Sequence, residues 1–193
     1  TSFVGLDNYV ALFKDRLFVQ AFGNTILFVI IIVPLQMGLA FGLALFIDKI
    51  SYCKTYFKIS FFIPVVMSLA VVSTLQIYNA EGILNTLLGW IGIDPQPFIY
   101  SAKQALPSIA FMSIWQGAGY QMLIFLGGLQ AISPSLYEAA EIDNASAWAK
   151  FRYITLPALK PILIFVFITI TIGAFKMVVQ PMVMTGGGPS YST

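Results

Sequence analysis

Charged side chains are so unevenly spaced that long stretches of this chain contain none. Residues 17–47, 59–80 and 104–137 are free of charge, and so are residues 161–175. A helix crosses the hydrocarbon of a bilayer in about 20 residues, so each of the first three stretches can hold one crossing with its flanking loop. Charged residues make up only 9% of the chain, whereas a soluble domain has about a quarter. The pattern therefore excludes a soluble enzyme and favours an integral membrane protein.

We predict an all-α, polytopic membrane protein with four visible spans, at residues 20–47, 57–78, 106–130 and 161–184. The fourth span contains Lys176. At 1.5 Å per residue this lysine lies about 24 Å along a helix from Lys160, near the outer interface. There its long side chain can reach the headgroups.

The basic residues orient these spans. Six of the ten Lys and Arg residues lie in the loops 48–58 and 131–160, which places both loops in the cytoplasm. Both ends of the chain are then outside, and the first residue is Thr1 rather than Met. We therefore expect residues 1–193 to be one transmembrane domain of a six-span protein whose first and last spans are missing. Within the outer loop, residues 82–93 are apolar but too short to cross, which predicts a helix lying on the outer face.

Several classes of function are disfavoured by residues that the chain lacks. It has no histidine and only one cysteine, so we expect no catalytic residues, no metal site and no internal disulfide. It contains no G-x-x-x-x-G-K-[ST] motif, so we expect no nucleotide or other cofactor and no enzymatic activity of its own. A net charge of +2 is too small to indicate binding to nucleic acid.

The cytoplasmic loop 133–161 contains most of the functional signal. Pro134 suits the first turn of a helix, and the acidic residues that follow suit the helix N-terminus. Asp143-Asn144 predicts a break between two short, alanine-rich helices. A slim helix of this kind can enter a groove on a partner protein. The alternative, a loop lying on the headgroups, is disfavoured because acidic residues are repelled by the negative cytoplasmic leaflet.

These residues resemble the EAA loop of permease subunits of binding-protein-dependent ABC importers, whose pattern is EAA-x-x-D-G-A, a spacer, and F-x-x-I-x-L-P. The matching residues here are Glu138, Ala139, Ala140, Asp143, Asn144, Ala145, Phe151, Ile154, Leu156 and Pro157. Asn144 replaces the usual glycine, and asparagine is the next most tolerant residue of a left-handed backbone. Further segments resemble the sugar-uptake branch, which includes the maltose and glycerol-3-phosphate permeases. They are residues 3–9, 21–25, 62–64, 114–116, 126–129 and 185–189.

The resemblance implies a multi-pass permease of the bacterial cell (inner) membrane that imports a sugar or oligosaccharide. Its implied partners are a cytoplasmic ATP-binding subunit dimer, a second permease subunit in a heterodimer, an extracellular or periplasmic solute-binding protein, and membrane lipid. Residues 131–161 would couple the permease to the ATPase through the EAA residues, with Leu156 and Pro157 setting the angle of the next span. Two alternatives stay open: a permease for another small polar solute, such as glycerol phosphate, and a secondary carrier outside this family.

Polar and aromatic side chains in the third span are candidates for the solute pathway. Trp115, Gln116, Tyr120 and Gln121 combine aromatic faces and amides, which suit the apolar ring faces and hydroxyls of a sugar. The alternative is that they only form hydrogen bonds between helices.

Overall fold

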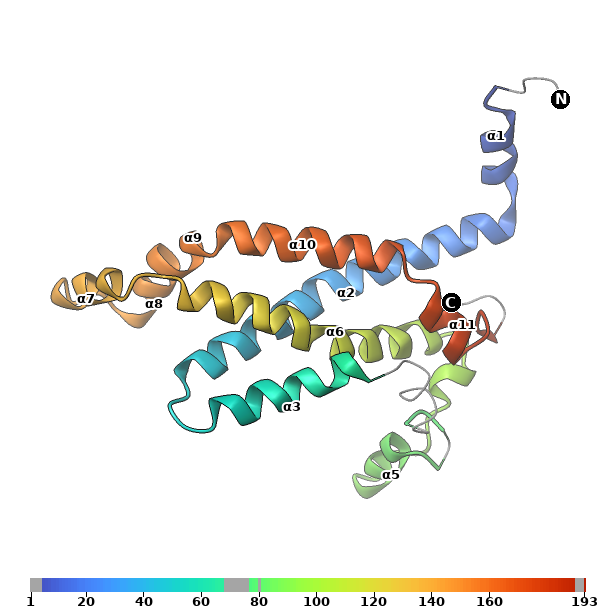
Figure 1. Cartoon of the computed structure of the whole chain (residues 1–193). Helices are drawn as coiled ribbons and strands as arrows, with labels where there is room; N and C mark the ends of the chain where they lie inside the picture. The colour runs from blue at the N-terminus through green and yellow to red at the C-terminus, as the bar shows by residue number, and fades with distance from the viewer. Residues whose placement is uncertain (1–4, 68–76, 80, 190–192) are drawn as a thin grey trace. The chain divides into compact units, whose positions relative to one another are not determined.

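The computed structural model describes residues 5–67, 77–79, 81–189 and 193, and within these ranges the chain is helical and contains no strand (Figure 1). The longer helices are α2 (Arg16–Lys49), α3 (Lys54–Val66), α6 (Ala105–Gln130) and α10 (Lys160–Phe175). The shorter elements are α1 (Asp7–Lys14), α5 (Ile83–Trp90), η1 (Phe98–Tyr100), α7 (Pro134–Ile142), α8 (Ala147–Lys150), η2 (Phe151–Thr155), α9 (Leu156–Ala158) and α11 (Val179–Met184).

The chain divides into two compact units, and the boundaries between them fall inside α2, α6 and α10. Unit 1 consists of Thr1–Ile31, Met67–Ser113 and Ala174–Thr193, and unit 2 of Ile32–Val66 and Ile114–Gly173. Each unit is described by itself below.

Two helices are long and apolar enough to cross a membrane, and they confirm the predicted spans 20–47 and 106–130. These are α2, with 34 residues, and α6, with 26. Asp15 marks the start of α2, because its carboxylate accepts a hydrogen bond of 2.9 Å from the backbone N–H of Leu17. An aspartate in this position satisfies a donor that the first helical turn leaves free.

The other two predicted spans differ from the structure. The span 57–78 is described only where α3 covers it, since residues 68–76 lie outside the described residues. The span 161–184 is wrong as one continuous helix: α10 ends at Phe175, and α11 begins at Val179. Pro181 explains the interruption, because it cannot donate a hydrogen bond to the carbonyl of Met177 and its ring clashes with that carbonyl. Residues 147–158 and 160–175, bent by 63°, together form a third candidate span.

Unit 2 is held together by small residues where its helices cross. In α2, Ala40 and Ala44 are fully buried. In α6, Gly119 packs against the backbone carbonyl of Phe61 in α3, and Gly128 packs against Ile162 in α10. Because lipid provides no hydrophobic force between helices, close backbone approach at such positions is a main source of helix association.

Unit 1 contains a short helix where the sequence predicts one. It appears as α5, and beside it Tyr78 and Met112 form a small buried cluster. The side chain of Asn85 ties the loop around α5 together. Its amide donates to the carbonyls of Asn79 and Gln96, at 3.0 Å each, and its oxygen accepts from the Gln96 N–H at 2.7 Å. The polar backbone of this connection is thereby satisfied at a buried position.

Candidate functional site: the α7–α8 hairpin and a face of α6

The predicted break between two short helices is confirmed as a hairpin of α7 and α8 in unit 2. Asn144 has a left-handed backbone, with φ of 52°. Its N–H donates to the carbonyl of Glu141 at 3.0 Å, and the N–H of Ala145 donates to that of Ala140 at 2.9 Å. This pair of hydrogen bonds is the Schellman arrangement that glycine usually completes at a helix end. Asparagine therefore keeps the turn, as the sequence predicts.

The inner face of α7 is fixed to the residues that follow it. Glu141 and Lys150 form an ion pair of 2.8 Å, and the hydrogen bond from Lys150 holds the pKa of the Glu141 carboxyl below its ordinary value. The hydroxyl groups of Tyr137 and Thr155 lie 2.8 Å apart in a second hydrogen bond. Both contacts join the first helix of the hairpin to its second half, so the hairpin can move as one body.

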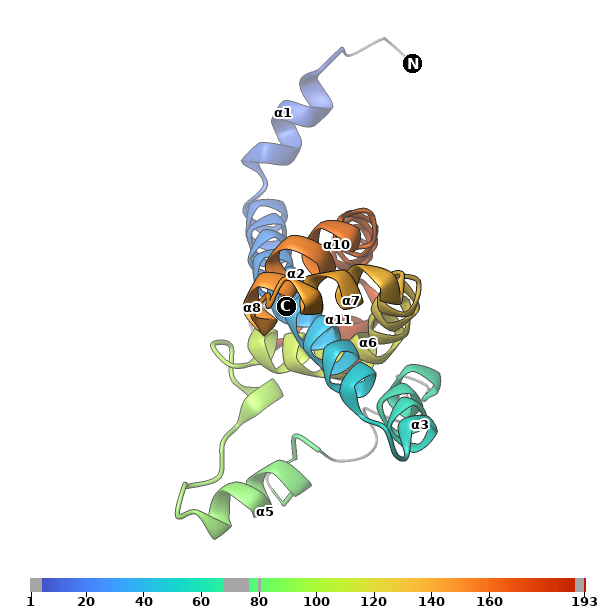
Figure 2. The same cartoon turned by 90° about the vertical axis from the view of Figure 1, so that its left-hand side faces the viewer.

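The outer face of α7 is exposed and combines apolar and acidic side chains. Leu136, Ala139 and Ile142 follow one another at i, i+3 and i+6, and Ile142 is 82% exposed. Glu138 and Asp143 flank this stripe, and among the described residues neither forms an ion pair. Figure 2, which looks at this end of unit 2, shows α7 and α8 facing the viewer. The arrangement suits a groove with apolar walls and basic residues at its rim.

Two aromatic side chains of the hairpin escaped the sequence analysis. Trp148 is 70% exposed, and Tyr153 is also mostly exposed. Large exposed aromatics of this kind often dominate the energy of a protein interface. Their signal was available in the sequence, since both are bulky aromatic residues in the loop 133–161, Tyr153 next to Arg152 and Trp148 two residues before Lys150.

The hairpin connects to α10 through irregular helix. Phe151–Thr155 form the π-helix η2, and α9 follows with Leu156 half-buried and Pro157 exposed. The chain then bends before α10 begins. A π-helix holds one extra residue in its turn and often marks a functional position.

The four candidates in α6 do not form one cluster. Gln121 is only 8% exposed, and its side-chain oxygen accepts a hydrogen bond of 3.1 Å from Gln36 in α2. Tyr120 is 52% exposed and shares a face with Gln116, four residues earlier. Trp115 is also exposed but lies about 140° around the helix from Tyr120, at 3.6 residues per turn. The structure therefore joins Gln121 to Gln36 and leaves Gln116 and Tyr120 on a separate face.

Comparison with known proteins identifies the family of this chain. Residues 46–192 match the family described as "Binding-protein-dependent transport system inner membrane component". A probable ABC transporter permease protein, YurN of Bacillus subtilis (strain 168), is 38% identical over 196 residues, covering 97% of this chain and 67% of that protein. The lactose transport system permease protein LacF of Rhizobium radiobacter is 35% identical over 199 residues, covering 99% of this chain and 66% of that protein.

A solved structure has the same fold. It is the crystal structure of a bacterial alginate ABC transporter in complex with an alginate pentasaccharide-bound periplasmic protein. One chain of it matches with a TM-score of 0.82 and 26% identity, covering 94% of this chain and 65% of that chain.

The family match and the helices long enough to cross a membrane thus define a transporter permease, a multi-pass protein of the inner membrane. The chain belongs to the family of binding-protein-dependent transport system inner membrane components, and the predicted resemblance to sugar ABC permeases is confirmed. It spans about two thirds of the length of the curated relatives it matches.

Proposed function

We propose that the chain is the permease subunit of an ATP-driven importer and that residues 131–161 bind its cytoplasmic ATPase dimer. The observation that carries this proposal is the outer face of α7, where an apolar stripe with a small residue at its centre is flanked by two carboxylates. Glu138, Ala139 and Asp143 would contact the ATPase. Ala140, Asn144 and Ala145 would hold the turn that presents them.

The connections of the hairpin support a mechanical role. The ion pair and the hydroxyl contact on its inner side make α7, α8 and η2 respond together. A displacement of the hairpin would then reach α10 through Leu156 and Pro157. When the ATPase dimer closes on ATP, this push would help to turn the permease pair from inward-facing to outward-facing.

The docking proposal is tested by enlarging the residue at the centre of the outer face. Ala139→Trp would prevent α7 from entering a groove, so we expect the ATPase subunit no longer to co-purify with the full-length permease and ATP-driven uptake to be lost. Ala158→Trp is the matched control, because Ala158 is also exposed in the same loop but lies on α9. Glu138→Lys should act like Ala139→Trp by reversing the charge at the rim.

The three variants are compared at equal amounts of permease in the membrane. If Ala139→Trp and Glu138→Lys retain the ATPase as well as Ala158→Trp does, the hairpin is not the docking element. If all three variants lose it, the effect is not specific to the outer face of α7, which also contradicts the proposal.

We further propose that the solute is a sugar or oligosaccharide. It would be delivered by an extracellular or periplasmic solute-binding protein and pass between this chain and a second permease. Gln116 and Tyr120 would contact it, since an amide and an aromatic ring on the exposed face of a membrane helix suit a water-filled path better than lipid. The sugar-transport names of LacF and of the alginate transporter support the class of solute.

The pathway proposal predicts different effects for residues on the two faces of α6. Tyr120→Ala or Gln116→Ala should raise the concentration of lactose, used as the probe sugar, that gives half-maximal uptake, while basal ATP hydrolysis stays unchanged. Gln121→Leu should instead lower the stability of the permease, because it leaves Gln36 without this partner. If Tyr120→Ala and Gln116→Ala both leave the uptake kinetics unchanged, Gln116 and Tyr120 only pack between helices and do not contact the solute.

A further inference from the structure

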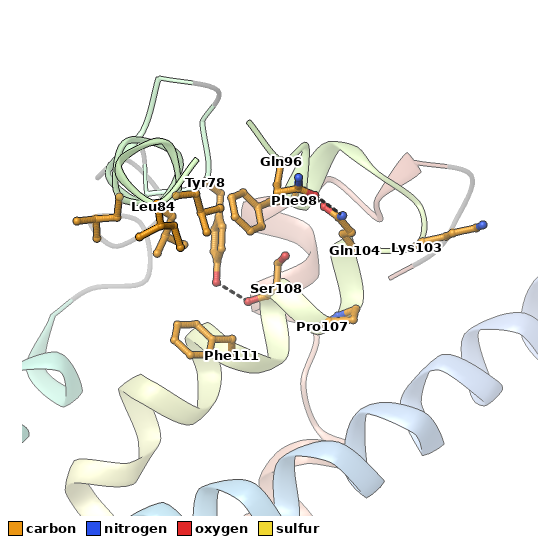
Figure 3. A pocket seen from close by; sticks show the side chains of 12 residues that line it. Tyr78, Leu84, Gln96, Phe98, Lys103, Gln104, Pro107, Ser108 and Phe111 are labelled. Atoms are coloured by element: carbon orange, nitrogen blue, oxygen red, sulfur yellow. Dashed lines mark hydrogen bonds between the residues drawn. The ribbon is translucent and has the colours of Figure 1, made fainter. Parts of the chain in front are cut away.

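A cavity of about 520 Å³ lies in unit 1 between α5 and the first two turns of α6. Figure 3 shows Tyr78, Leu84, Phe98 and Phe111 around it, with Lys103 extending outward from its edge. Its volume is in the range of about 300–1,000 Å³ that is typical of small-molecule sites in proteins. None of the coupling or pathway residues discussed above lines it.

The polar groups beside this cavity are engaged in holding its walls. The hydroxyl of Tyr78 donates to the carbonyl of Ser108 at 2.7 Å. The side chain of Gln104 donates to that of Gln96 at 3.1 Å and accepts from the N–H of Phe98 at 3.0 Å. The remaining lining is mostly aliphatic and aromatic. A sugar would find few free hydrogen-bond partners there. A hydrocarbon chain has no polar groups, so it would fit without losing any hydrogen bonds.

The position of the cavity along α6 brings it to the edge of the bilayer. At 1.5 Å per residue the 26 residues of α6 extend about 39 Å, compared with about 30 Å of hydrocarbon. If the excess is shared between the ends, Ser108 lies at the boundary, Phe111 lies inside the hydrocarbon, and Lys103 lies among the headgroups. In α5, Ile83 and Trp90 are exposed, as in a helix that lies in the interface.

Charge on the lining favours a lipid with a negative headgroup. Lys103 is the cation of this lining, and no carboxylate is found among the described residues that form it. Basic residues at the membrane surface attract anionic lipids. We propose that this cavity binds an anionic phospholipid, with one acyl chain beside Tyr78 and Phe111 and the phosphate near Lys103. The lipid would hold α5 against α6 and stiffen the outer face of unit 1.

The test uses the full importer in nanodiscs of phosphatidylcholine and phosphatidylglycerol. A phosphatidylglycerol with a diazirine in its acyl chain is added, irradiated, and its adducts are mapped by mass spectrometry. We expect adducts on the peptides that contain residues 83–91 and 105–111. Leu87→Trp should remove most of them, because Leu87 lines the cavity and is partly exposed, so the larger ring can fill the space. Ile83→Trp, on the same helix but outside the lining, should leave them unchanged.

A second variant tests the headgroup. Lys103→Gln should lower the preference for phosphatidylglycerol over a phosphatidylcholine probe by about fivefold, which corresponds to about 1 kcal/mol for one lysine near the surface. Equal adduct yields in Leu87→Trp and Ile83→Trp would overturn the proposal. So would a photoreactive amino acid at Leu87 that cross-links to another subunit instead of lipid, because a protein segment would then occupy the cavity.

Discussion

Gly119 is the position where α6 comes against the backbone of α3, and its replacement by alanine measures how much that approach contributes. A Cβ atom at Gly119 would collide with the carbonyl oxygen of Phe61 and would also come within 3.1 Å of the Val65 side chain. The carbonyl belongs to a helix backbone and cannot rotate away, so the two helices would have to separate. Overpacking of this kind costs about 1–3 kcal/mol.

The same helix provides a matched control for this substitution. A Cβ atom at Gly127 would meet nothing within 4 Å, so Gly127→Ala adds the same methyl group without a collision. Both changes gain about 1 kcal/mol of helix propensity over glycine. We therefore expect Gly127→Ala to be neutral or slightly stabilising, and Gly119→Ala to be less stable than Gly127→Ala by about 1–3 kcal/mol.

The assay is equilibrium unfolding of the purified full-length permease by SDS in mixed micelles, followed by circular dichroism. The quantity to compare is the difference in unfolding free energy between Gly119→Ala and Gly127→Ala. Both variants gain the same helix propensity over glycine, so that gain cancels in the difference. Equal unfolding midpoints for Gly119→Ala and Gly127→Ala would show that α3 and α6 do not approach closely at Phe61, and would refute the packing that we describe for unit 2.

Other contacts give further predictions. Asn144→Gly should keep the hairpin turn, whereas Asn144→Val should destabilise it by about 1–2 kcal/mol and weaken co-purification of the ATPase subunit. Gln36→Leu should cost about 1–3 kcal/mol in SDS unfolding, because it leaves the buried Gln121 amide unpaired, and adding Gln121→Leu should recover most of that loss. The lowered pKa of Glu141 means that its ion pair stabilises the hairpin at neutral pH and that this stabilisation is lost as the pH falls through the lowered value. Limited proteolysis near Lys150 should therefore rise on acidification, and Glu141→Gln should remove that dependence.

The sequence predicts best those elements whose cause is local. The span around α6 follows from a long run without charge, and the break at Asn144 follows from residues that favour a left-handed turn. The short helix α5 follows from a short apolar run, and it ends just before Gly92, which has a left-handed backbone with φ of 79°. In each case the residues that cause the structure lie within the element or beside it, so no knowledge of its neighbours is needed.

Features that depend on distant contacts could not be predicted in this way. The pairing of Gln36 with Gln121 joins residues 85 positions apart, and the sequence analysis could offer Gln121 only as a pathway residue or a packing residue. Likewise, Glu141 belongs to the same acidic cluster as Glu138, yet it is Glu141 that forms the ion pair with Lys150, with its side chain 69% exposed. Which carboxylate finds a basic partner depends on where the second helix of the hairpin returns.

The π-helix at residues 151–155 shows why an irregular helix is hard to predict from the sequence. Its sequence, FRYIT, contains no glycine or proline that would indicate an irregular turn. What accompanies it is a tertiary contact, the hydrogen bond between the Tyr137 and Thr155 hydroxyls, which fixes the end of η2 against α7. Because this contact ties the end of η2 to α7, a displacement of α7 would carry η2 with it. We therefore expect η2 to be where a displacement of the hairpin changes the angle of α10, and Tyr137→Phe to weaken ATP-driven uptake without preventing ATPase co-purification.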